Sequence, residues 1–384
     1  MKKVTVSVIK ADVGSIGGHT RPSDPMLAAV RARVARVVHE GMLIDAVVTH
    51  TGDDISLIMS HAHSVGSTEI HRFAWDCFLT ATEEAKSAGL YGAGQDLLVD
   101  APAGNVRGAG PAVAEIAFAR DPKSKDRPAE AFLVFAADKC GPGAYNYPLY
   151  TVFCDPMHNG GLLLNPKMHK GFTLTIIDMD HKGKDGDRVI QLDVPERTWD
   201  VACLVQNPDR FAIEAVNSRY KPDEQIVSVS ATRLHNIAGK YTGKDDPVML
   251  VRTQMNFPAT GEVLQPYAIG HFVAGCMRGS HQMPLMPVPL NSTVSYFDGP
   301  PVVSAAGFCV QQGKLTEPVD AFAHPFWNTV RDRISTKAME MRLQGFSGPA
   351  MLPMNELEYT GVMEKLKELD TRFKVRVEKR VAAD

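Results

Sequence analysis

The sequence of 384 residues has little net charge and no long apolar run. Its 41 Lys and Arg residues stand against 44 Asp and Glu residues, which leaves a formal net charge of -3. A chain with this balance has no overall electrostatic attraction to nucleic acid or to an anionic membrane. No apolar run is long enough for a signal peptide or a membrane-spanning helix, so we expect a cytoplasmic protein with neither kind of partner.

Paired cysteine motifs and a Walker phosphate loop are also missing. The six cysteines are Cys77, Cys140, Cys154, Cys203, Cys276 and Cys309, and none forms a C-x-x-C pair. This spacing is typical of free thiols in a reducing compartment and argues against a zinc–thiolate site. The glycine-rich stretch 90–111 is not a Walker loop, because no Gly-Lys-Ser/Thr follows it. No internal repeat or linker-like composition is apparent, so one large domain is expected.

The stretch from Gly239 to Pro247 reads GKYTGKDDP and places one amine against two carboxylates. Lys244 is followed directly by Asp245 and Asp246. A lysine that attacks a carbonyl group must be neutral, and adjacent carboxylates alone would keep it protonated. A divalent metal such as magnesium, which prefers hard oxygen ligands, would neutralise these aspartates. Taken alone, the motif is more typical of a solvated Lys-Asp turn, and the carboxylates found elsewhere in the chain reverse this preference.

Carboxylates also stand at the ends of three predicted strands. The strands are 4–11, 43–50 and 131–137, and the carboxylates are Asp12, Asp53, Asp54 and Asp138. Aspartate is a common turn residue, so one such position has little meaning. Several from separated segments are hard to explain without a shared cation. The third strand is apolar throughout, which predicts burial on both of its faces.

Two amphipathic helices are predicted among these strands. The first runs from Met26 to a natural stop at Gly41, and the second opens at Ser67 and ends at Gly89. The alternation of strands and helices predicts an α/β fold built in layers. His61, His63 and His71 flank the second helix. Their spacing is compatible with a metal, although no third ligand lies in register.

The C-terminal segment 363–380 is rich in charges of both signs. We expect a partly helical tail with a solvated face rather than a nucleic-acid-binding arm. The expected division is therefore one domain over residues 1–361 and a charged tail over residues 362–384.

Eight motifs, taken in order, resemble the fructose-1,6-bisphosphate aldolase/phosphatase family. They are IKAD at 9–12, TGDD at 51–54, YGAGQDLL at 91–98, GNVRG at 104–108, ADK at 137–139, GPGAYN at 141–146, GKYTGKDDPV at 239–248 and RGSH at 278–281. The resemblance implies a bifunctional gluconeogenic enzyme. Its single site would join glyceraldehyde 3-phosphate to dihydroxyacetone phosphate and then remove the C1 phosphate to give fructose 6-phosphate. It also implies a single-domain α-β-β-α sandwich, a homo-octamer and several Mg²⁺ ions.

The resemblance further assigns roles to individual residues. Lys244 would form the Schiff base, and Tyr241 would serve in proton transfer. The implied magnesium ligands are Asp12, His19, Asp53, Asp54, Gln95, Asp138, Asp245 and Asp246. The implied substrate contacts are His19, Tyr91, Gly104, Asn105, Lys139, Gln254, Arg278, Asp298 and Tyr359. In this family the loop that carries the lysine swings out after the first reaction, and its two aspartates swing in. This loop corresponds to residues 239–247 and is called the lysine loop below. Gly239 and Gly243 would allow the movement.

Three positions depart from the family pattern. Cys140-Gly141 stands where Thr-Glu is expected, Gln282-Met283 replaces an aromatic residue and a glycine, and 101–103 is less polar than usual. None of these changes removes an implied catalytic group, but the first two bear on the relative rates of the two activities. Two other functions stay open: a magnesium phosphatase without the aldolase step, and a metal-stabilised scaffold or sugar-phosphate sensor without turnover.

Overall fold

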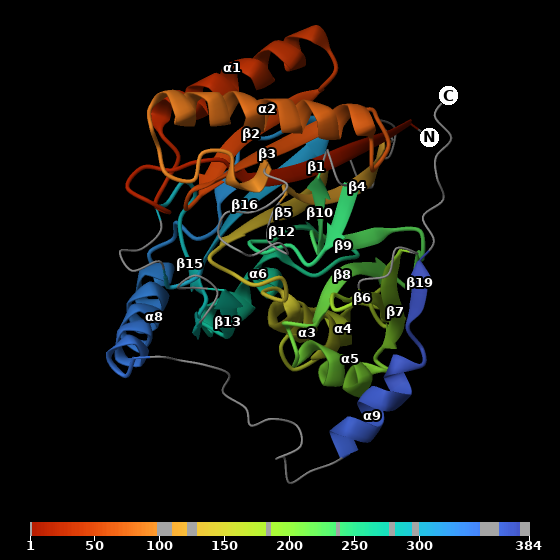
Figure 1. Cartoon of the computed structure of the whole chain (residues 1–384). Coiled ribbons are helices and arrows are strands. Elements are labelled where there is room, and N and C mark those ends of the chain that lie inside the picture. The colour runs from red at the N-terminus through yellow and green to blue at the C-terminus, as the bar shows by residue number, and fades with distance from the viewer. Residues whose placement is uncertain are drawn as a thin grey trace.

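Two β-sheets lie face to face between layers of helices (Figure 1). The computed structural model describes residues 2–97, 110–120, 129–181, 186–235, 239–275, 281–293, 299–345 and 361–376. Helices α1 and α2 lie over the first sheet, and most other helices lie beyond the second sheet. The α/β class expected from the sequence is confirmed, and the layers follow the order helix, sheet, sheet, helix.

Within the described ranges, the first sheet is antiparallel and has six strands. In spatial order they are β11 (Gly239–Thr242), β10 (Thr232–His235), β4 (Ala112–Arg120), β1 (Lys2–Asp12), β3 (Asp54–His61) and β2 (Asp45–Thr51). Its helices are α1 (Asp24–Glu40) and α2 (Thr68–Ser87). The stop predicted for the first helix is confirmed, because Gly41 caps α1 with φ 86°.

The second sheet is larger. Its main path is β15 (Met286–Pro287), β16 (Val302–Gln311), β5 (Glu130–Asp138), β12 (Val248–Thr253), β9 (Gln225–Val229), β8 (Phe211–Ser218), β6 (Phe172–Asp178), β7 (Asp187–Val194) and β19 (Lys374–Arg376). Two short strands, β17 (Lys314–Leu315) and β18 (Val319–Asp320), pair with β16. A separate hairpin is formed by β13 (Phe272–Gly275) and β14 (His281–Pro284).

The other helices within the described ranges are mostly short. They are η1 (Gln95–Leu97), α3 (Asn146–Cys154), α4 (Gly161–Leu164), α5 (Thr198–Val205), α6 (Thr260–Leu264), η2 (Gln265–Ala268), α8 (Phe326–Leu343) and α9 (Gly361–Asp370). None of the helices in the described ranges combines the length and the apolar character needed to span a bilayer.

Three apolar clusters fill the three spaces between the layers. One lies between α1, α2 and the first sheet, one between the two sheets, and one between the second sheet and the other helices. Strand β5 belongs to two of them: Phe132 and Val134 face the first sheet, while Leu133 and Phe135 face the helices. The period-two alternation of a strand therefore explains why this segment is apolar at every position, as the sequence predicted.

Residues 361–376 pack against the second sheet and its helices. Leu369 of α9 is fully buried, and β19 pairs with β7 through Val375 and Arg188. Arg376 binds both carboxylate oxygens of Glu214 on β8 at 2.9 Å. Helix α9 and strand β19 therefore lie against the second sheet, and β19 extends that sheet at its edge.

Candidate active site

The carboxylates predicted at strand ends meet beside the two sheets. Asp12 ends β1 and pairs in register with Asp54, the first residue of β3, while Asp138 ends β5. Oxygen and nitrogen atoms of Asp12, His19 and Asp53 lie within 4.8 Å of one another, and so do oxygens of Asp53, Asp54 and Asp138. Asp53 belongs to both groups, so the two groups form one cluster, which we call the carboxylate cluster.

A tight turn places Asp53 in this cluster. Strands β2 and β3 pair with Thr51 opposite Asp54, which leaves only Gly52 and Asp53 to make the turn. Gly52 has φ 56°, a left-handed conformation that glycine adopts without steric cost and that two-residue hairpins require. The hairpin-like connection predicted from the sequence is therefore confirmed, and it points a fully buried carboxylate at the ends of β1 and β5.

Two lysines neutralise part of the carboxylate cluster. Lys139 Nζ donates to Asp53 Oδ1 and to Asp138 Oδ1, both at 2.8 Å. Lys10 is buried in β1 and forms an ion pair with Asp54. Buried charges need such partners, because removing an ion from water without one is costly. The carboxylate cluster keeps an excess of negative charge, which further cations would neutralise.

The pKa values of the carboxyl groups show the same excess of negative charge. Burial raises the pKa of Asp54 to about 7 and the pKa values of Asp12 and Asp138 well above their usual range, and repulsion between the aspartates adds to this. Burial opposes ionisation of Asp53 as well, but Lys139 and His19 hold its pKa below the usual range. Without added cations, the cluster would therefore hold protons that ordinary aspartates release.

The donor set fits a divalent metal ion. Asp138 Oδ2 is buried and has no hydrogen-bond partner among the described residues. A buried carboxylate oxygen without a donor is unfavourable, and a hard cation would satisfy it. Carboxylate oxygens with one imidazole suit Mg²⁺ better than they suit a thiophilic metal. Asp12, His19, Asp53, Asp54 and Asp138 are therefore the described residues best placed to hold such an ion.

The lysine loop enters the same region from the turn between β11 and β12. The Lys244 side chain is 3% exposed, and its Nζ lies 3.3 Å from Asp96 Oδ2. Asp246 is tied to the end of β5: its Oδ1 accepts from the Cys140 backbone N–H at 2.7 Å, and its own N–H donates to the Cys140 carbonyl at 2.8 Å. The alternative of a solvated Lys-Asp turn does not apply, because the lysine is buried.

Two charged residues of the site were missed by the sequence analysis. Lys10 follows Val4, Val6 and Val8 on the strand face that packs between the sheets. The sequence did contain a signal for this residue: Lys10 occupies the next position of an alternation that is otherwise apolar. Asp96 is buried in η1 between the end of β1 and Lys244, and no local pattern distinguishes it from an ordinary loop aspartate.

Several other predicted residues lie near the carboxylate cluster. The Tyr91 ring meets the His19 ring edge-on, with centroids 5.0 Å apart. Gln95 begins η1, which follows Gly94, whose N–H donates to the Val13 carbonyl just beyond β1. Asp245 is half-buried beside Lys244.

Gln254 is not brought to the cluster within this chain. Strand β12 runs antiparallel to β5, with Val248 opposite Ala136 and Thr253 opposite Ala131. The start of β12 therefore lies near Asp138, and Gln254 lies just past the opposite end of that strand. There it is exposed and donates to Thr260 Oγ1 at 2.9 Å.

The remaining predicted residues lie wholly or partly outside the part of the chain that the structure describes. Tyr241 lies on β11, where its backbone pairs with Arg233, but its side chain is outside the part of the chain that the structure describes. Wholly outside that part are Gly104, Asn105, Arg278, Asp298 and Tyr359.

The first departure from the family pattern lies directly at the site. Besides bonding Asp246 through its backbone, Cys140 is buried, and its Sγ lies 3.5 Å from the Asp138 carbonyl oxygen. Gly141 N–H donates to the Ala274 carbonyl at 2.6 Å, so β13 passes close to this turn. The altered pair therefore sits between a proposed metal ligand and the lysine loop. The second departure, Gln282-Met283, lies on β14 with Met283 fully buried.

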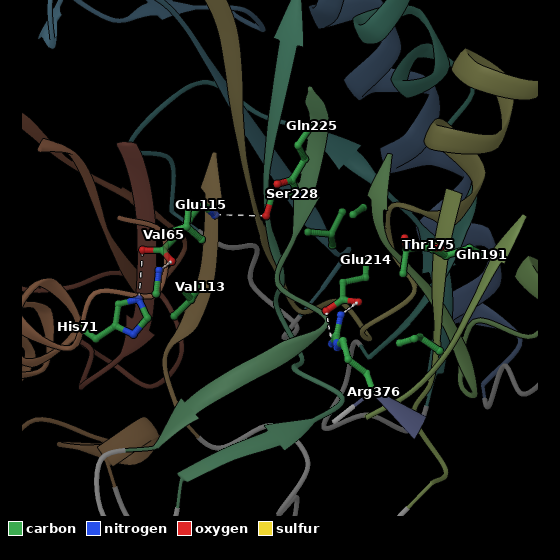
Figure 2. A pocket seen from close by; sticks show the side chains of 14 residues that line it. Val65, His71, Val113, Glu115, Thr175, Gln191, Glu214, Gln225, Ser228 and Arg376 are labelled. Carbon is green, nitrogen blue, oxygen red and sulfur yellow. Dashed lines mark hydrogen bonds and ion pairs between the residues drawn. The ribbon is translucent and has the colours of Figure 1, made fainter. Parts of the chain in front are cut away.

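A cavity of about 310 Å³ opens between the first sheet and the outer strands of the second sheet (Figure 2). Figure 2 shows Glu115 and His71 on one wall and Glu214 and Arg376 on the other. Glu115 accepts from His71 at 3.1 Å and from the Gly66 N–H at 2.7 Å, and Arg376 is paired with Glu214. Because its charged groups are already bonded to one another, this cavity is a weaker candidate for catalysis than the carboxylate cluster.

The three histidines near α2 do not form a metal site. His61 Nε2 lies 2.7 Å from Ser7 Oγ, His63 faces Glu69, and His71 faces Glu115. The groups of metal-compatible side chains found in the described ranges do not include them. His63 and His71 instead hold the N-terminal end of α2 to the first sheet, and His61 joins β3 to β1.

His61 should make the protein less stable in mild acid. Burial lowers its pKa to about 4, while the unfolded chain has the ordinary value of 6.5. Between pH 6.5 and 4 the unfolded chain therefore binds a proton that the folded chain does not, and this lowers the free energy of unfolding by up to about 1.4 kcal/mol per pH unit. Thermal melting from pH 7 to 4 should show a shallower loss for His61→Gln than for the wild type. The matched control is His39→Gln, which changes an exposed histidine of α1; equal slopes in all three proteins would contradict the assignment.

Comparison with known proteins places the chain in one family. A sequence model described as fructose-1,6-bisphosphatase matches residues 3–374. The fructose-1,6-bisphosphate aldolase/phosphatase of Thermus thermophilus is 53% identical over 371 residues, which cover 97% of this chain and 99% of that protein. Proteins of the same name are 46% identical in Cenarchaeum symbiosum, with 97% and 95% of the two chains covered, and 44% identical in Ignicoccus hospitalis, with 97% and 93% covered. The resemblance found in the eight motifs is confirmed, and this chain belongs to the fructose-1,6-bisphosphatase family.

Proposed function

We propose that this chain is a bifunctional fructose-1,6-bisphosphate aldolase/phosphatase of gluconeogenesis. One observation carries the proposal: a buried amine, Lys244, reaches the edge of a carboxylate cluster suited to divalent cations. A phosphatase alone has no need to bury a lysine there. The names of the relatives, which contain both activities, support the same conclusion.

The aldolase half uses Lys244 as the nucleophile. Its neutral amine adds to the C2 carbonyl of dihydroxyacetone phosphate, and water leaves as the Schiff base forms. Loss of a proton from the neighbouring carbon gives an enamine, which attacks the aldehyde carbon of glyceraldehyde 3-phosphate. Tyr241 is assigned to the proton transfers of this step. Hydrolysis of the Schiff base then frees fructose 1,6-bisphosphate and returns the amine.

The phosphatase half uses the carboxylate cluster. The proposed ligands of several Mg²⁺ ions are Asp12, His19, Asp53, Asp54, Gln95, Asp138, Asp245 and Asp246. Magnesium bound there supplies positive charge for the phosphoryl oxygens and lowers the pKa of water. Lys139 adds a fixed positive charge between Asp53 and Asp138.

Substrate contacts surround this centre. Tyr91, packed on His19, would form one wall of the sugar-phosphate site. The further contacts proposed are Gly104, Asn105, Gln254, Arg278, Asp298 and Tyr359, of which Gln254 would have to serve another copy of the chain, because it lies far from this cluster. That requirement agrees with the proposed homo-octamer, which we expect in the cytoplasm as one catalytic domain with a short C-terminal segment.

The two reactions require two positions of the lysine loop. Here Lys244 is inward and the Asp246 carboxylate is held by the Cys140 N–H, an arrangement suited to the aldol step. For Asp245 and Asp246 to serve as ligands, the loop has to turn. Gly243, with φ 80°, is the described residue whose conformation allows such a change at small backbone cost.

Reductive trapping tests the aldolase half. Incubation with dihydroxyacetone phosphate and borohydride should add the reduced triose phosphate to the peptide that carries Lys244, as read by mass spectrometry. Omission of the triose phosphate is the control. Release of phosphate from fructose 1,6-bisphosphate with magnesium, but without any label on Lys244, would leave a phosphatase only. Absence of both would favour a sensor or scaffold without turnover.

A further inference from the structure

We infer that Asp96 is the positioning residue for the Lys244 amine, a role that rests on the proposed function. Asp96 is not among the ligands or substrate contacts that the family resemblance implies. It is the middle residue of η1, and it is 5% exposed. Asp96 is thus a buried carboxylate that is not among the proposed metal ligands, and its role belongs to the aldol step alone.

One oxygen of Asp96 joins two distant segments of the site. Asp96 Oδ2 accepts from the Asp12 backbone N–H at 2.9 Å and lies 3.3 Å from Lys244 Nζ. Asp12 is 84 residues before Asp96 in the sequence, and Lys244 is 148 residues after it. The reactive amine is therefore held at a fixed place relative to the end of β1, which also carries a proposed metal ligand.

Asp96 itself stands on a rigid support. The N–H of Gly94 donates to the Val13 carbonyl at 3.0 Å, and the N–H of Leu97 donates to the Gly94 carbonyl at 3.0 Å. Gly94 has φ 77°, and a Cβ there would lie 2.9 Å from Thr82 Cγ2 of α2. The turn is thus clamped between β1 and α2, and a carboxylate on such a support can hold an amine within a small range of positions.

A carboxylate is a stronger hydrogen-bond acceptor for the amine than a neutral side chain is. The N–H groups of a buried amine need an acceptor, and Asp96 Oδ2 provides one 3.3 Å from Nζ. Asp246, two residues after the lysine, directs its Oδ1 to the Cys140 N–H. An asparagine at position 96 would keep an oxygen for the Asp12 N–H but would lose the charge that attracts the amine.

The test compares Asp96→Asn with a matched control, Asp200→Asn. Asp200 on α5 is 4% exposed and pairs with Lys365 at 2.8 Å and with Arg197 and Arg372, so it is a similarly buried, ion-paired aspartate that lies outside the site. The readouts are the rate of borohydride trapping at Lys244, the phosphatase kcat on fructose 1,6-bisphosphate with magnesium, and the Tm. We expect Asp96→Asn to slow trapping about tenfold or more while the phosphatase kcat stays within about threefold of wild type. The control should change neither rate.

Two outcomes would overturn the inference. Trapping at the wild-type rate in Asp96→Asn would show that the carboxylate does not position the amine. An equal loss of trapping and phosphatase activity would show a general structural role. Failure of the wild type itself to be trapped would instead refute the proposed function, so the two failures are distinguishable.

A second measurement serves if Asp96→Asn lowers the Tm so far that its rates cannot be measured. In a Lys244→Met background the carboxylate has no lysine to hold, so Asp96→Asn should lower the Tm less there than in the wild type. Equal losses in the two backgrounds would also overturn the inference.

Discussion

Replacement of Lys244 by alanine is expected to abolish the formation of fructose 6-phosphate from the two triose phosphates, with a loss of at least about 1000-fold. The variant has no amine to form the Schiff base, and no other reaction in the proposed mechanism activates the ketone. Release of phosphate from added fructose 1,6-bisphosphate should survive at least in part, because every proposed ligand remains. A coupled assay for fructose 6-phosphate separates the two activities when it is started once from the two triose phosphates and once from fructose 1,6-bisphosphate.

The matched control for this variant is Lys367→Ala, which removes an exposed lysine of α9. It should leave both assays unchanged. Production of fructose 6-phosphate from trioses by Lys244→Ala at a rate near that of the wild type would remove the lysine from the mechanism. A complete loss of both activities with an unchanged Tm would also contradict the proposal, because Lys244 is assigned to the aldolase reaction and not to the phosphatase reaction.

Asp53→Asn should lower the magnesium-dependent release of phosphate by at least about 100-fold. Asp53 is the residue common to both groups of the carboxylate cluster, and it is fully buried. The substitution keeps the size of the side chain but removes the charge that faces Lys139 and His19. Titration calorimetry with Mg²⁺ should show weaker binding, and the phosphatase rate should need more magnesium to reach its maximum.

Asp178→Asn provides the comparison for this second variant. Asp178 on β6 is 2% exposed and binds Arg188 and Arg210, but it lies outside the cluster. Its loss should lower the Tm without changing magnesium affinity. Equal magnesium affinity in Asp53→Asn and the wild type would remove Asp53 from the proposed ligands.

Local patterns in the sequence were sufficient to predict the strands that carry the carboxylate cluster. The valine alternation of β1 and the apolar run of β5 predict strands because side chains of a strand alternate between its faces. The partners of these strands could not be read in the same way, because strand pairing depends on contacts between distant segments. Helix α5 could not be predicted either, because it is 8 residues long and apolar on most sides and so shows no clear helical period.

The site was predictable to a different degree. The aspartates at strand ends and the Lys-Asp-Asp motif stand out in the sequence, but individual roles came from the family resemblance rather than from spacing. Asp96 and Lys10 were missed because their importance lies in what they touch across the fold. Gln254 lies far from the cluster because the direction of β12 decides which end of the strand faces it.

The two halves of the site have different supports, and this has a consequence for how such enzymes diverge. Asp12, Asp54 and Asp138 stand on paired strands of the framework, whereas Lys244 to Asp246 are carried by a turn. A change at Lys244 within the turn can remove carbon–carbon bond formation while its two aspartates and the strand-borne acids persist. Descendants that have become simple sugar-phosphate hydrolases would then be recognisable by an intact framework and an altered turn.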